Sequence, residues 1–542
     1  MFTDTLELKF TLTAGGKNFK IPAGDIKAFT MDLHPYGFTC QVNFWVSNEQ
    51  KADDLFPFFV RPDLIRANLE VVSYYNPMHL ALEALKLQGL VMQKSILNER
   101  TIENVNLQQD PVIYRYYQIT FADPASVLWR QHFPCDLLTD KTVKDLLDAH
   151  KGSEVTLKYD WDALDKQFAI NTLALGVEAN QASFYDFVLW FVSTMDGVLT
   201  YDCNENTYTL SKTKKEDGQP AELAELDVES LQIEFPETIR HSADLLNACS
   251  EDPRREPVEQ SQAVSGVRHD YIGRFVISSD FADRKNLESQ RLKVREHELY
   301  AVFRNFPLIP YRPGCLIELA KEGWSKKLFA QGKVYRIRDI SFAANAAQRE
   351  VTAGHNLPYG KFDIDMKSRL ELKSEKWTDL PQFQLPLFPL CVEGRIKSEI
   401  GEDNENTYQI YQDRETSLDQ YRVIIPLFDN QEVVVPFAPD FLMGHFYFPV
   451  YKNARVLVAI GFHSARIEQF LDWGPGARLP MDTQGNHIFL GKWKDAKNQT
   501  SINHVYVDEK PVLNVKRTSE VDTQMVKLEE GRLVMEVKEE EQ

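Results

Sequence analysis

Apolar and polar positions alternate along much of residues 1–123. Leu6, Leu8, Phe10 and Leu12 are separated by Glu, Lys and Thr, which is the two-residue period of a half-buried strand. The glycine pair that follows, at positions 15 and 16, predicts a turn. Runs rich in aromatic and β-branched residues predict further strands at 39–46, 69–75, 89–96 and 113–121.

Two segments change to a helical period. One follows Asp140, at about 142–150, where three apolar side chains share a face and a glycine follows. The other begins at Ser183, with Asp186 three residues later as in a capping box. Its apolar positions fall at helical spacing, Gly197 is expected to end it, and a strand is expected at 198–201. Those apolar positions are Phe187, Trp190, Phe191 and Met195.

The middle of the chain is predicted to be mostly strands joined by polar segments. Residues 211–230 and 250–268 are polar and charged and are predicted to be loops. Strands are expected again from 271 to about 351, including 315–319 and 334–340. The segment 379–390 contains Pro381, Pro386 and Pro389, too many prolines for a helix or sheet interior, so it is predicted to be an extended connection.

Beyond that connection, strands are predicted at 391–396, 421–428, 432–437 and 455–462, with an insertion at 401–417. Together they have the size of a small β-barrel. The tail after position 485 again alternates apolar and polar residues, with charged residues and a glycine between the runs. A segment this thin cannot bury a strand face alone, and identical copies of itself are the simplest partner.

Composition narrows the function. The formal net charge is −19, and residues 390–480 hold 8 Lys and Arg against 13 Asp and Glu. This charge disfavours nucleic acid and anionic membrane surfaces as partners. The first residues lack the pattern of a signal peptide, and the longest apolar runs are far shorter than a membrane helix needs, so a soluble cytosolic protein is expected. The six scattered cysteines are expected to be free thiols: Cys40, Cys135, Cys203, Cys249, Cys315 and Cys391.

Each partial match to a known catalytic motif in the sequence lacks at least one residue that the motif requires. His297-Glu298 lacks the second histidine of a zinc protease, because Ala301 stands in its place. Gly332-Lys333 lacks the rest of a phosphate-binding loop, and neither GxSxG nor GxGxxG occurs. With 80 Asp and Glu residues, a glycosidase pair stays open as an alternative. His445 and His463 could bind a metal, but packed or surface histidines are the favoured interpretation. No catalytic, metal or cofactor residue is therefore predicted.

Three stretches, at 114–150, 182–202 and 444–473, follow one another as in a known family. The first is a hub-type strand leading through an aromatic-leucine segment into Asp-Lys-Thr-Val and a helix. The second is a helix ending in Met195-Asp196-Gly197 before an aromatic strand. The third is a proline turn before a valine-rich strand. In this order the chain resembles the valine-glycine repeat protein G (VgrG) spikes of type VI secretion systems, and equally the hub and needle of other contractile injection systems and of phage baseplates.

The resemblance implies a mainly β fold with a few helices (α+β). It implies hub β-barrel domains at 1–378 with inserted helices, a linker at 379–390, an OB-fold barrel at 391–480 and a short needle at 481–542. It further implies a homotrimer whose tail strands wrap into a β-prism. The candidate interior residues of that prism are Val526, Leu528, Leu533, Met535 and Val537.

As a non-enzymatic spike, the protein would join a sixfold inner tube to a membrane-puncturing tip. Its implied partners are an Hcp-like tube protein, baseplate proteins, a PAAR-like tip or separate spike cap, and effectors, with only transient contact with the target membrane. It would assemble in the bacterial cytoplasm and be secreted or injected on firing. The acidic residues before the second helix follow the family pattern only in part, and the tail of about 60 residues leaves no room for a fused effector. Two alternatives stay open: a tail-associated cell-wall hydrolase or glycan-binding protein, and an OB-fold nucleic-acid-binding protein.

Overall fold

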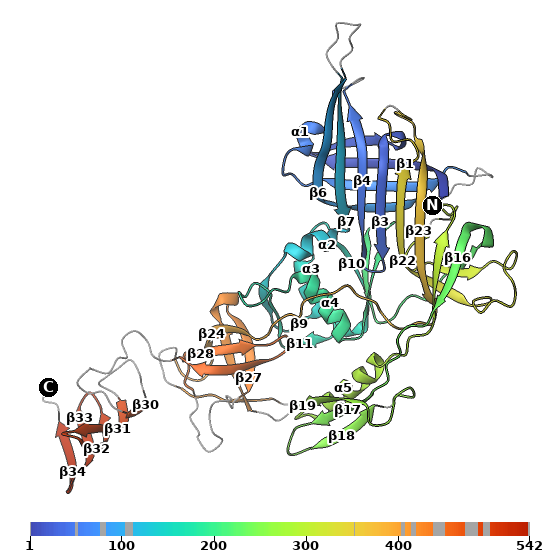
Figure 1. The fold of residues 1–542 in the computed structure, drawn as a ribbon. Helices are drawn as coiled ribbons and strands as arrows, with labels where there is room; N and C mark the ends of the chain where they lie inside the picture. The colour runs from blue at the N-terminus through green and yellow to red at the C-terminus, as the bar shows by residue number, and fades with distance from the viewer. Residues whose placement is uncertain are drawn as a thin grey trace. The chain divides into compact units, whose positions relative to one another are not determined.

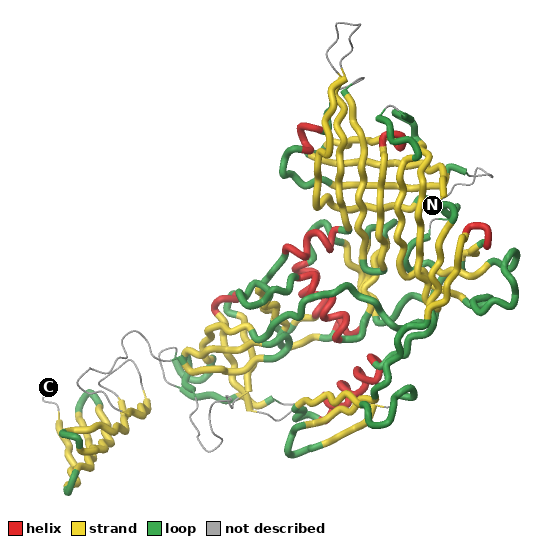
Figure 2. Tube along the Cα trace, in the orientation of Figure 1, coloured by secondary structure: helices red, strands yellow, loops and turns green. Residues whose placement is uncertain are grey.

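The computed structural model describes residues 2–48, 52–75, 83–102, 112–258, 260–309, 311–351, 353–402, 407–413, 419–436, 450–471, 486–491 and 499–539. The chain is mainly β with a few helices, as predicted (Figure 2). It divides into two compact units. The first unit is Met1–Pro134, Lys144–Lys166 and Glu178–Pro386, and the second unit is Cys135–Val143, Gln167–Val177 and Leu387–Gln542.

The first unit is built on strands that close into a ring, in the order β22-β3-β4-β7-β6-β5-β1-β23 with β23 pairing back to β22 (Figure 1). All of the pairs in this ring are antiparallel. The alternating burial of β1, in which Leu6, Leu8, Phe10 and Leu12 point inward, shows that the period in the sequence marks the ring interior. The bounds are β1 (Phe2–Ala14), β3 (Ile26–His34), β4 (Gly37–Ser47), β5 (Arg66–Ser73), β6 (Leu85–Ile102), β7 (Val112–Ala122), β22 (Val334–Ala346) and β23 (Tyr359–Leu372).

A second sheet grows from β22 and β23, which run on beyond the ring. Its order is β15-β21-β22-β23-β20-β16, so β15 and β16 are its two edges. The short strand β2 (Lys17–Pro22) forms a hairpin with β1 across Gly15 and Gly16, as predicted. The bounds of the added strands are β15 (Ala221–Leu223), β16 (Val228–Glu234), β20 (Glu298–Phe303) and β21 (Leu316–Leu319).

The helices of the first unit are short, and α4 (Phe184–Thr194) is the most buried of those described. Ser183 caps it and forms the predicted capping box with Asp186, and α3 (Val143–His150) also lies where expected. Trp190 is only half-buried, whereas Tyr185 and Val188, which the sequence pattern did not single out, are buried. Other elements here are α1 (Phe56–Phe59), α2 (Pro124–Leu128), η1 (Ala23–Asp25), η2 (Trp129–Gln131), η3 (Asp162–Asp165), β10 (Thr156–Asp160), β13 (Val198–Asp202) and β14 (Thr207–Ser211).

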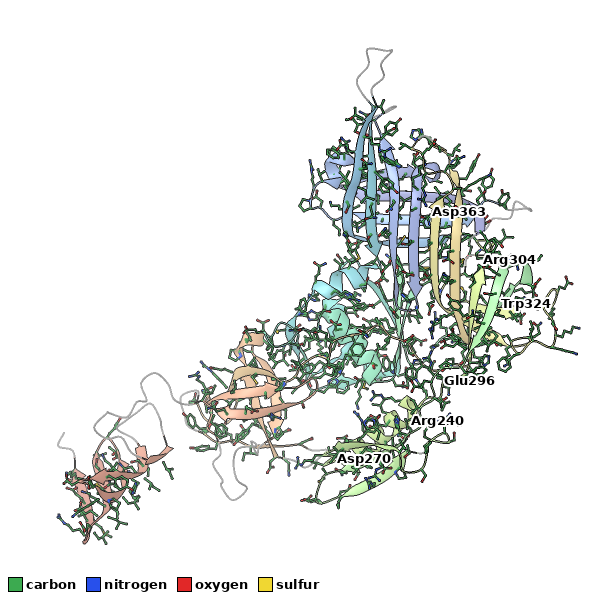
Figure 3. All side chains as sticks on the ribbon, in the orientation of Figure 1. Arg240, Asp270, Glu296, Arg304, Trp324 and Asp363 are labelled. Atoms are coloured by element: carbon green, nitrogen blue, oxygen red, sulfur yellow. The ribbon has the colours of Figure 1, made fainter. Side chains whose placement is uncertain are left out.

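A small module lies between β16 and β20 in the chain. Its three strands are ordered β18-β17-β19, and α5 (Ser278–Arg291) packs on β17 and β18. Asp270, labelled in Figure 3, belongs to an ion-pair network with Arg255 and Arg268 on the face that includes Ile272. The strand bounds are β17 (Ser242–Asn247), β18 (Arg254–Val258) and β19 (Arg268–Gly273).

Three expectations for the middle of the chain were wrong. The predicted loop 211–230 contains β15, η4 (Glu225–Asp227) and the start of β16, and the predicted loop 250–268 contains β18. β16 and β18 are polar because each is the edge strand of its sheet, where only some of its side chains are buried. The strands expected after 271 are interrupted by α5, whose only fully buried side chains are Phe281 and Glu288, too few to give an apolar period.

The end of α4 also differs from the prediction. Asp196 is the residue in the left-handed conformation, with φ of 54°. Gly197 is needed for another reason, because a Cβ at this position would lie 2.3 Å from the Trp161 ring. The glycine therefore permits a close approach of an aromatic ring, while the aspartate makes the turn.

The second unit contains a six-stranded antiparallel sheet in the order β25-β26-β24-β28-β29, with β27 paired to β26. Its core also includes Leu137, Ile170 and Ala174, which come from two segments far earlier in the chain. The amide of Thr172 donates to the carbonyl of Phe462 at 3.1 Å, which fastens one of these segments to the sheet. The bounds are β8 (Cys135–Leu138), β9 (Lys141–Thr142), β11 (Gln167–Phe168), β12 (Asn171–Ala174), β24 (Leu390–Ile396), β25 (Tyr411–Gln412), β26 (Asp419–Ile425), β27 (Gln431–Pro436), β28 (Arg455–Ile460), β29 (Ala465–Phe470) and η5 (Pro426–Phe428).

Candidate functional site: the carboxyl-terminal sheet

The last described strands form a five-stranded antiparallel meander, shown in red in Figure 1. Each strand pairs with the next one in sequence, and short turns set the register of β31 to β34. Asp508 and Glu509, both at positive φ, make the turn between β31 and β32. The strands are β30 (Asn486–Gly491), β31 (Gln499–Val507), β32 (Lys510–Thr518), β33 (Asp522–Glu529) and β34 (Arg532–Glu539).

The register aligns one apolar side chain from every strand in a single row. Directly paired residues of an antiparallel sheet share a face, and the row consists of Ile488, Ile502, Val515, Val526 and Met535. Met535 is 74% exposed, and Ile488 and Val515 are exposed as well. Burying an aliphatic side chain fully is worth about 1.5–3 kcal/mol, so the exposed row is a strong candidate for an interface.

A second row on the same face adds Leu513, Leu528 and Leu533, and a third adds Val537 opposite Gln524. Leu533 is 59% exposed. The five residues singled out in the sequence, Val526, Leu528, Leu533, Met535 and Val537, therefore lie together on one face, which we call the apolar face. Their burial between copies of the chain stays a prediction.

The opposite face is more polar. Asn514 and Lys527 face each other across β32 and β33, and Lys516 is in the next row. Val512 is buried on this side. The exposed apolar side chains are therefore concentrated on the apolar face.

Sequence reasoning missed Ile488 and Ile502 as members of the apolar face. The signal was weak, because β30 is separated from β31 by residues 492–498 and only the pairing of Ile488 with Ile502 brings it into the row. Leu513 and Val515 alternate clearly in the sequence, and their register with β33 gives them the same role.

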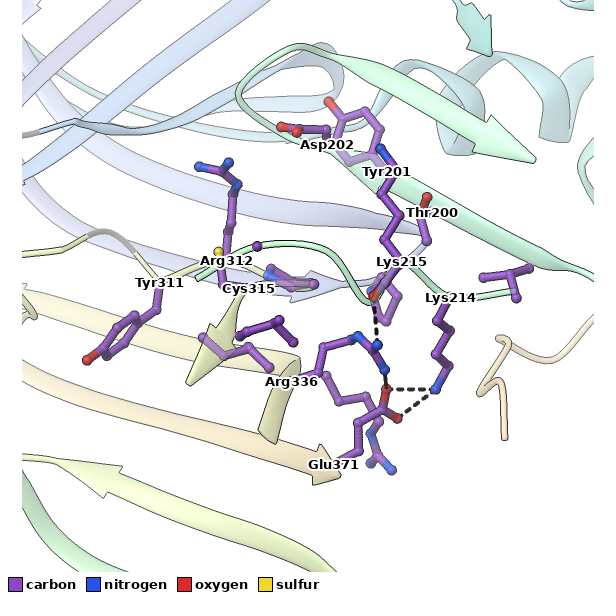
Figure 4. Close-up of a pocket in the computed structure, with 18 of the residues that line it drawn as sticks. Thr200, Tyr201, Asp202, Lys214, Lys215, Tyr311, Arg312, Cys315, Arg336 and Glu371 are labelled. Atoms are coloured by element: carbon purple, nitrogen blue, oxygen red, sulfur yellow. Dashed lines mark hydrogen bonds and ion pairs between the residues drawn. The ribbon is translucent and has the colours of Figure 1, made fainter. Parts of the chain in front are cut away.

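The first unit contains a cavity of about 470 Å³, drawn in Figure 4. The strand β13, the segment 214–221 and the ends of β21, β22 and β23 line it. At one wall, Lys214 Nζ is 2.7 and 2.8 Å from the Glu371 carboxylate oxygens, and Arg336 Nη1 is 3.1 Å from Oε1.

The ammonium of Lys214 has no N–H donor left for a ligand. It also donates to the carbonyl of Trp377 at 2.5 Å, and Arg336 Nη2 donates to the carbonyls of Lys215 and Lys373. Burial lowers the pKa of Lys214, and the charge of Glu371 opposes this. The cluster therefore fixes the segment that begins at Lys214 to the second sheet, and it gives no sign of catalysis.

The histidines considered as metal ligands have other surroundings. His463 stacks on Phe168 with 3.8 Å between ring centroids, and its Nδ1 is 3.1 Å from the carbonyl oxygen of Ile170. His445 lies outside the described residues. Within the described ranges no group of three His, Cys, Asp or Glu is arranged to hold a metal ion. The six cysteines are free, as expected, and none of the helices in the described residues is long and apolar enough to cross a membrane.

No protein-family model and no curated protein matches the sequence, whereas solved structures do. A chain of the lidless PdpA–VgrG complex matches with a TM-score of 0.71 at 11% identity, over 99% of this chain and 99% of that one. Chains of the half-lidded and lidded Francisella PdpA–VgrG complexes match with a TM-score of 0.70 at 12% identity. They cover 98% and 99% of this chain, and 88% and 80% of their own length. The chain thus shares the fold of a chain in the PdpA–VgrG complex, which confirms the predicted resemblance to VgrG-like proteins at the level of fold.

Proposed function

We propose that the protein is the hub-and-spike subunit of a contractile injection apparatus and works as a homotrimer. One observation carries this proposal: the carboxyl-terminal sheet exposes an apolar face with a continuous row across all five strands. The fold shared with chains of the PdpA–VgrG complex supports it.

Three copies of the apolar face would form the inside of a prism. Threefold closure buries each copy of the face against two others, using the same surface patch three times. Closure also protects the edges of the sheet, and a prism of intertwined strands resists mechanical load. The work of puncture would come from the contracting sheath, so the subunit needs stiffness and no catalytic step.

The first unit would be the docking platform of this assembly. In this proposal it meets an Hcp-like inner tube and baseplate proteins, while a PAAR-like tip or separate cap closes the needle and effectors travel with it. The complex would assemble in the bacterial cytoplasm and leave the cell on firing.

The test is the solution mass of the full chain, measured by light scattering. A subunit of 62.5 kDa gives a trimer of about 188 kDa. We expect a trimer for the full chain, and a smaller particle for a chain ending at residue 485, which lacks the sheet.

A point variant sharpens this test. Met535→Asp places a charge in the apolar face and should dissociate or weaken the trimer, because an unpaired carboxylate cannot be buried there without large cost. Met525→Asp is the matched control, since Met525 lies on β33 and faces the opposite side, across from Glu536. A well-folded monomer at micromolar concentration would contradict the proposal, and turnover of peptidoglycan would then favour the cell-wall hydrolase.

A further inference from the structure

The strand β16 is the last strand of the second sheet, and β20 is the neighbour with which it pairs. A β-bulge separates Val228 from Ser230, after which the register runs regularly to Glu234 opposite Glu298. An edge strand presents a row of main-chain donors and acceptors that can pair with another chain. The first unit therefore contains a potential strand-addition site.

The apolar layer of the sheet continues to this edge and stops there. One cross-strand row runs through Ile337, Leu370, Leu299 and Ile233. The first three side chains are at most 1% exposed, whereas Ile233 is 39% exposed. A neighbouring row ends in the same way, from buried Ala301 to half-buried Leu231. A further strand beside β16 would complete the layer.

The other edge of the same sheet is closed to such an addition. β15 has three residues, and Tyr311 and Trp324 side chains donate hydrogen bonds to the carbonyls of Glu222 and Leu223. Trp324 and Arg304 are labelled in Figure 3, and the Arg304 amide donates to Asp227 just before β16. These bonds fix the segment that leads into β16 and leave the strand itself as the open edge.

Charge at this edge selects the partner. Residues 221–239 contain six Asp and Glu and no Lys or Arg, and Glu229 and Glu234 are exposed on β16. Phe235, 74% exposed, extends the apolar side chains past the end of the strand. Carboxylates beside apolar side chains complement a strand in which basic and apolar residues alternate.

We propose that β16 accepts an extended segment of a partner protein, added as an edge strand, in which Lys or Arg alternates with apolar residues. Main-chain hydrogen bonds supply affinity, and the side chains of alternate positions supply selectivity. The added strand covers Ile233 and Leu231, and its cations neutralise Glu229 and Glu234. This interaction surface is separate from the apolar face of the carboxyl-terminal sheet and does not depend on the proposed trimer.

Hydrogen exchange of the full chain tests the proposal. The probe is a blocked eight-residue peptide that alternates valine and lysine, at millimolar concentration, and its control alternates valine and glutamate. We expect the lysine peptide to slow exchange of the amides in 229–235, the glutamate peptide to have no effect, and added salt to weaken the protection.

Ile233→Lys is expected to weaken the protection about tenfold, the equivalent of about 1.4 kcal/mol. Leu226→Lys is the matched control, because Leu226 is 74% exposed but lies in η4, outside β16. Glu234→Lys, which leaves the apolar layer intact, gives a second variant if Ile233→Lys does not fold.

Three results would overturn the proposal. Equal protection of 229–235 by the lysine and glutamate peptides would show that β16 does not select a basic strand. Slow exchange, without peptide, of the amides in 229–235 that do not bond to β20, unchanged in Ile233→Lys, would show that the outer edge is already closed. A lower particle mass for Ile233→Lys would show that a second copy of this chain occupies β16.

Discussion

Two adjacent residues after α4, Asp196 and Gly197, have different roles in the turn that ends the helix. Asp196 takes the left-handed conformation, and its carboxylate is 2.7 Å from Lys293 Nζ. Gly197 lies against the Trp161 ring, where a Cβ would be 2.3 Å from the nearest ring carbon. The sequence indicated a stop here, but the two causes could be separated only with the ring in place.

We predict that Gly197→Ala lowers the free energy of unfolding by about 1–3 kcal/mol, the usual cost of overpacking a core. Thermal unfolding measures it. The control is Gly16→Asn, because Gly16 has φ of 75°, has open space around it, and stands where asparagine is tolerated. An unchanged unfolding temperature for Gly197→Ala would mean that Trp161 can move aside at no cost.

His132 and His150 form a close pair beside Phe184. His132 Nε2 is 3.3 Å from His150 Nδ1, and both rings lie within 6 Å of the Phe184 ring. Burial, and then the charge of His150, lower the pKa of His132 from its ordinary value of 6.5. The folded chain therefore favours neutral His132, and the unfolded chain binds more protons in the window below 6.5.

Stability from this pair is fully present above about pH 6.5 and is lost as the pH falls toward the lowered pKa of His132. We predict that the free energy of unfolding, measured by urea titration, decreases as the pH is lowered from about 7.5 to 5.5. The decrease is up to about 1.4 kcal/mol for each pKa unit of the shift, and His132→Gln should make it smaller. His504→Gln, in β31, serves as the control variant. If His132→Gln and the unaltered chain lose the same stability, the pair is not responsible.

At the scale of elements, the most informative segments are β8 and β12. They are far from β24 in the chain, but the residues Leu137, Ile170 and Ala174 belong to the core of the six-stranded sheet. The stack of His463 on Phe168, in β11, joins the segment that includes β12 to the residues between β28 and β29. These short strands complete the core of the second unit.

We therefore predict that Leu137→Ala destabilises the six-stranded sheet by about 2–4 kcal/mol, through lost apolar burial and a cavity. Hydrogen exchange of β24 and β28 should become faster, although both strands are more than 200 residues away in sequence. Leu97→Ala, an exposed leucine of β6, is the control. Unchanged exchange in β24 would show that these strands contribute little to the core.

Strands with a clear period and helices with caps could be predicted from the sequence. β1, β4 and α4 are such elements, because each has one strongly apolar face or a capping box. β16 and α5 could not be predicted from the sequence, because an edge strand and a surface helix bury few side chains. The five candidate residues of the apolar face were predicted from alternation, but Ile488 joined them only through its register with β31.

For the whole molecule, the order of parts in the sequence was enough to predict a VgrG-like fold, which the solved structures confirm. The division of the chain was harder to predict, because the chain passes between the two units repeatedly, at 134, 143, 166, 177 and 386. The local pattern of apolar and polar residues does not show where the chain passes from one unit to the other. The apolar residues of the returning segments, such as Leu137 and Ile170, resemble any other core residue until their neighbours are known.

Because the second unit is built from segments that are far apart in the chain, its parts are synthesised at different times. Leu137 and Ile170 are synthesised 253 and 220 residues before β24 begins, an interval of roughly 10 to 50 s at about 5–20 residues per second. During that interval β8 and β12 can pair with each other, but the six-stranded sheet that completes their core is absent. A chain that stops before β24 lacks this sheet and leaves the apolar side chains of Leu137 and Ile170 without it, so we expect chaperones and proteases to recognise such incomplete chains.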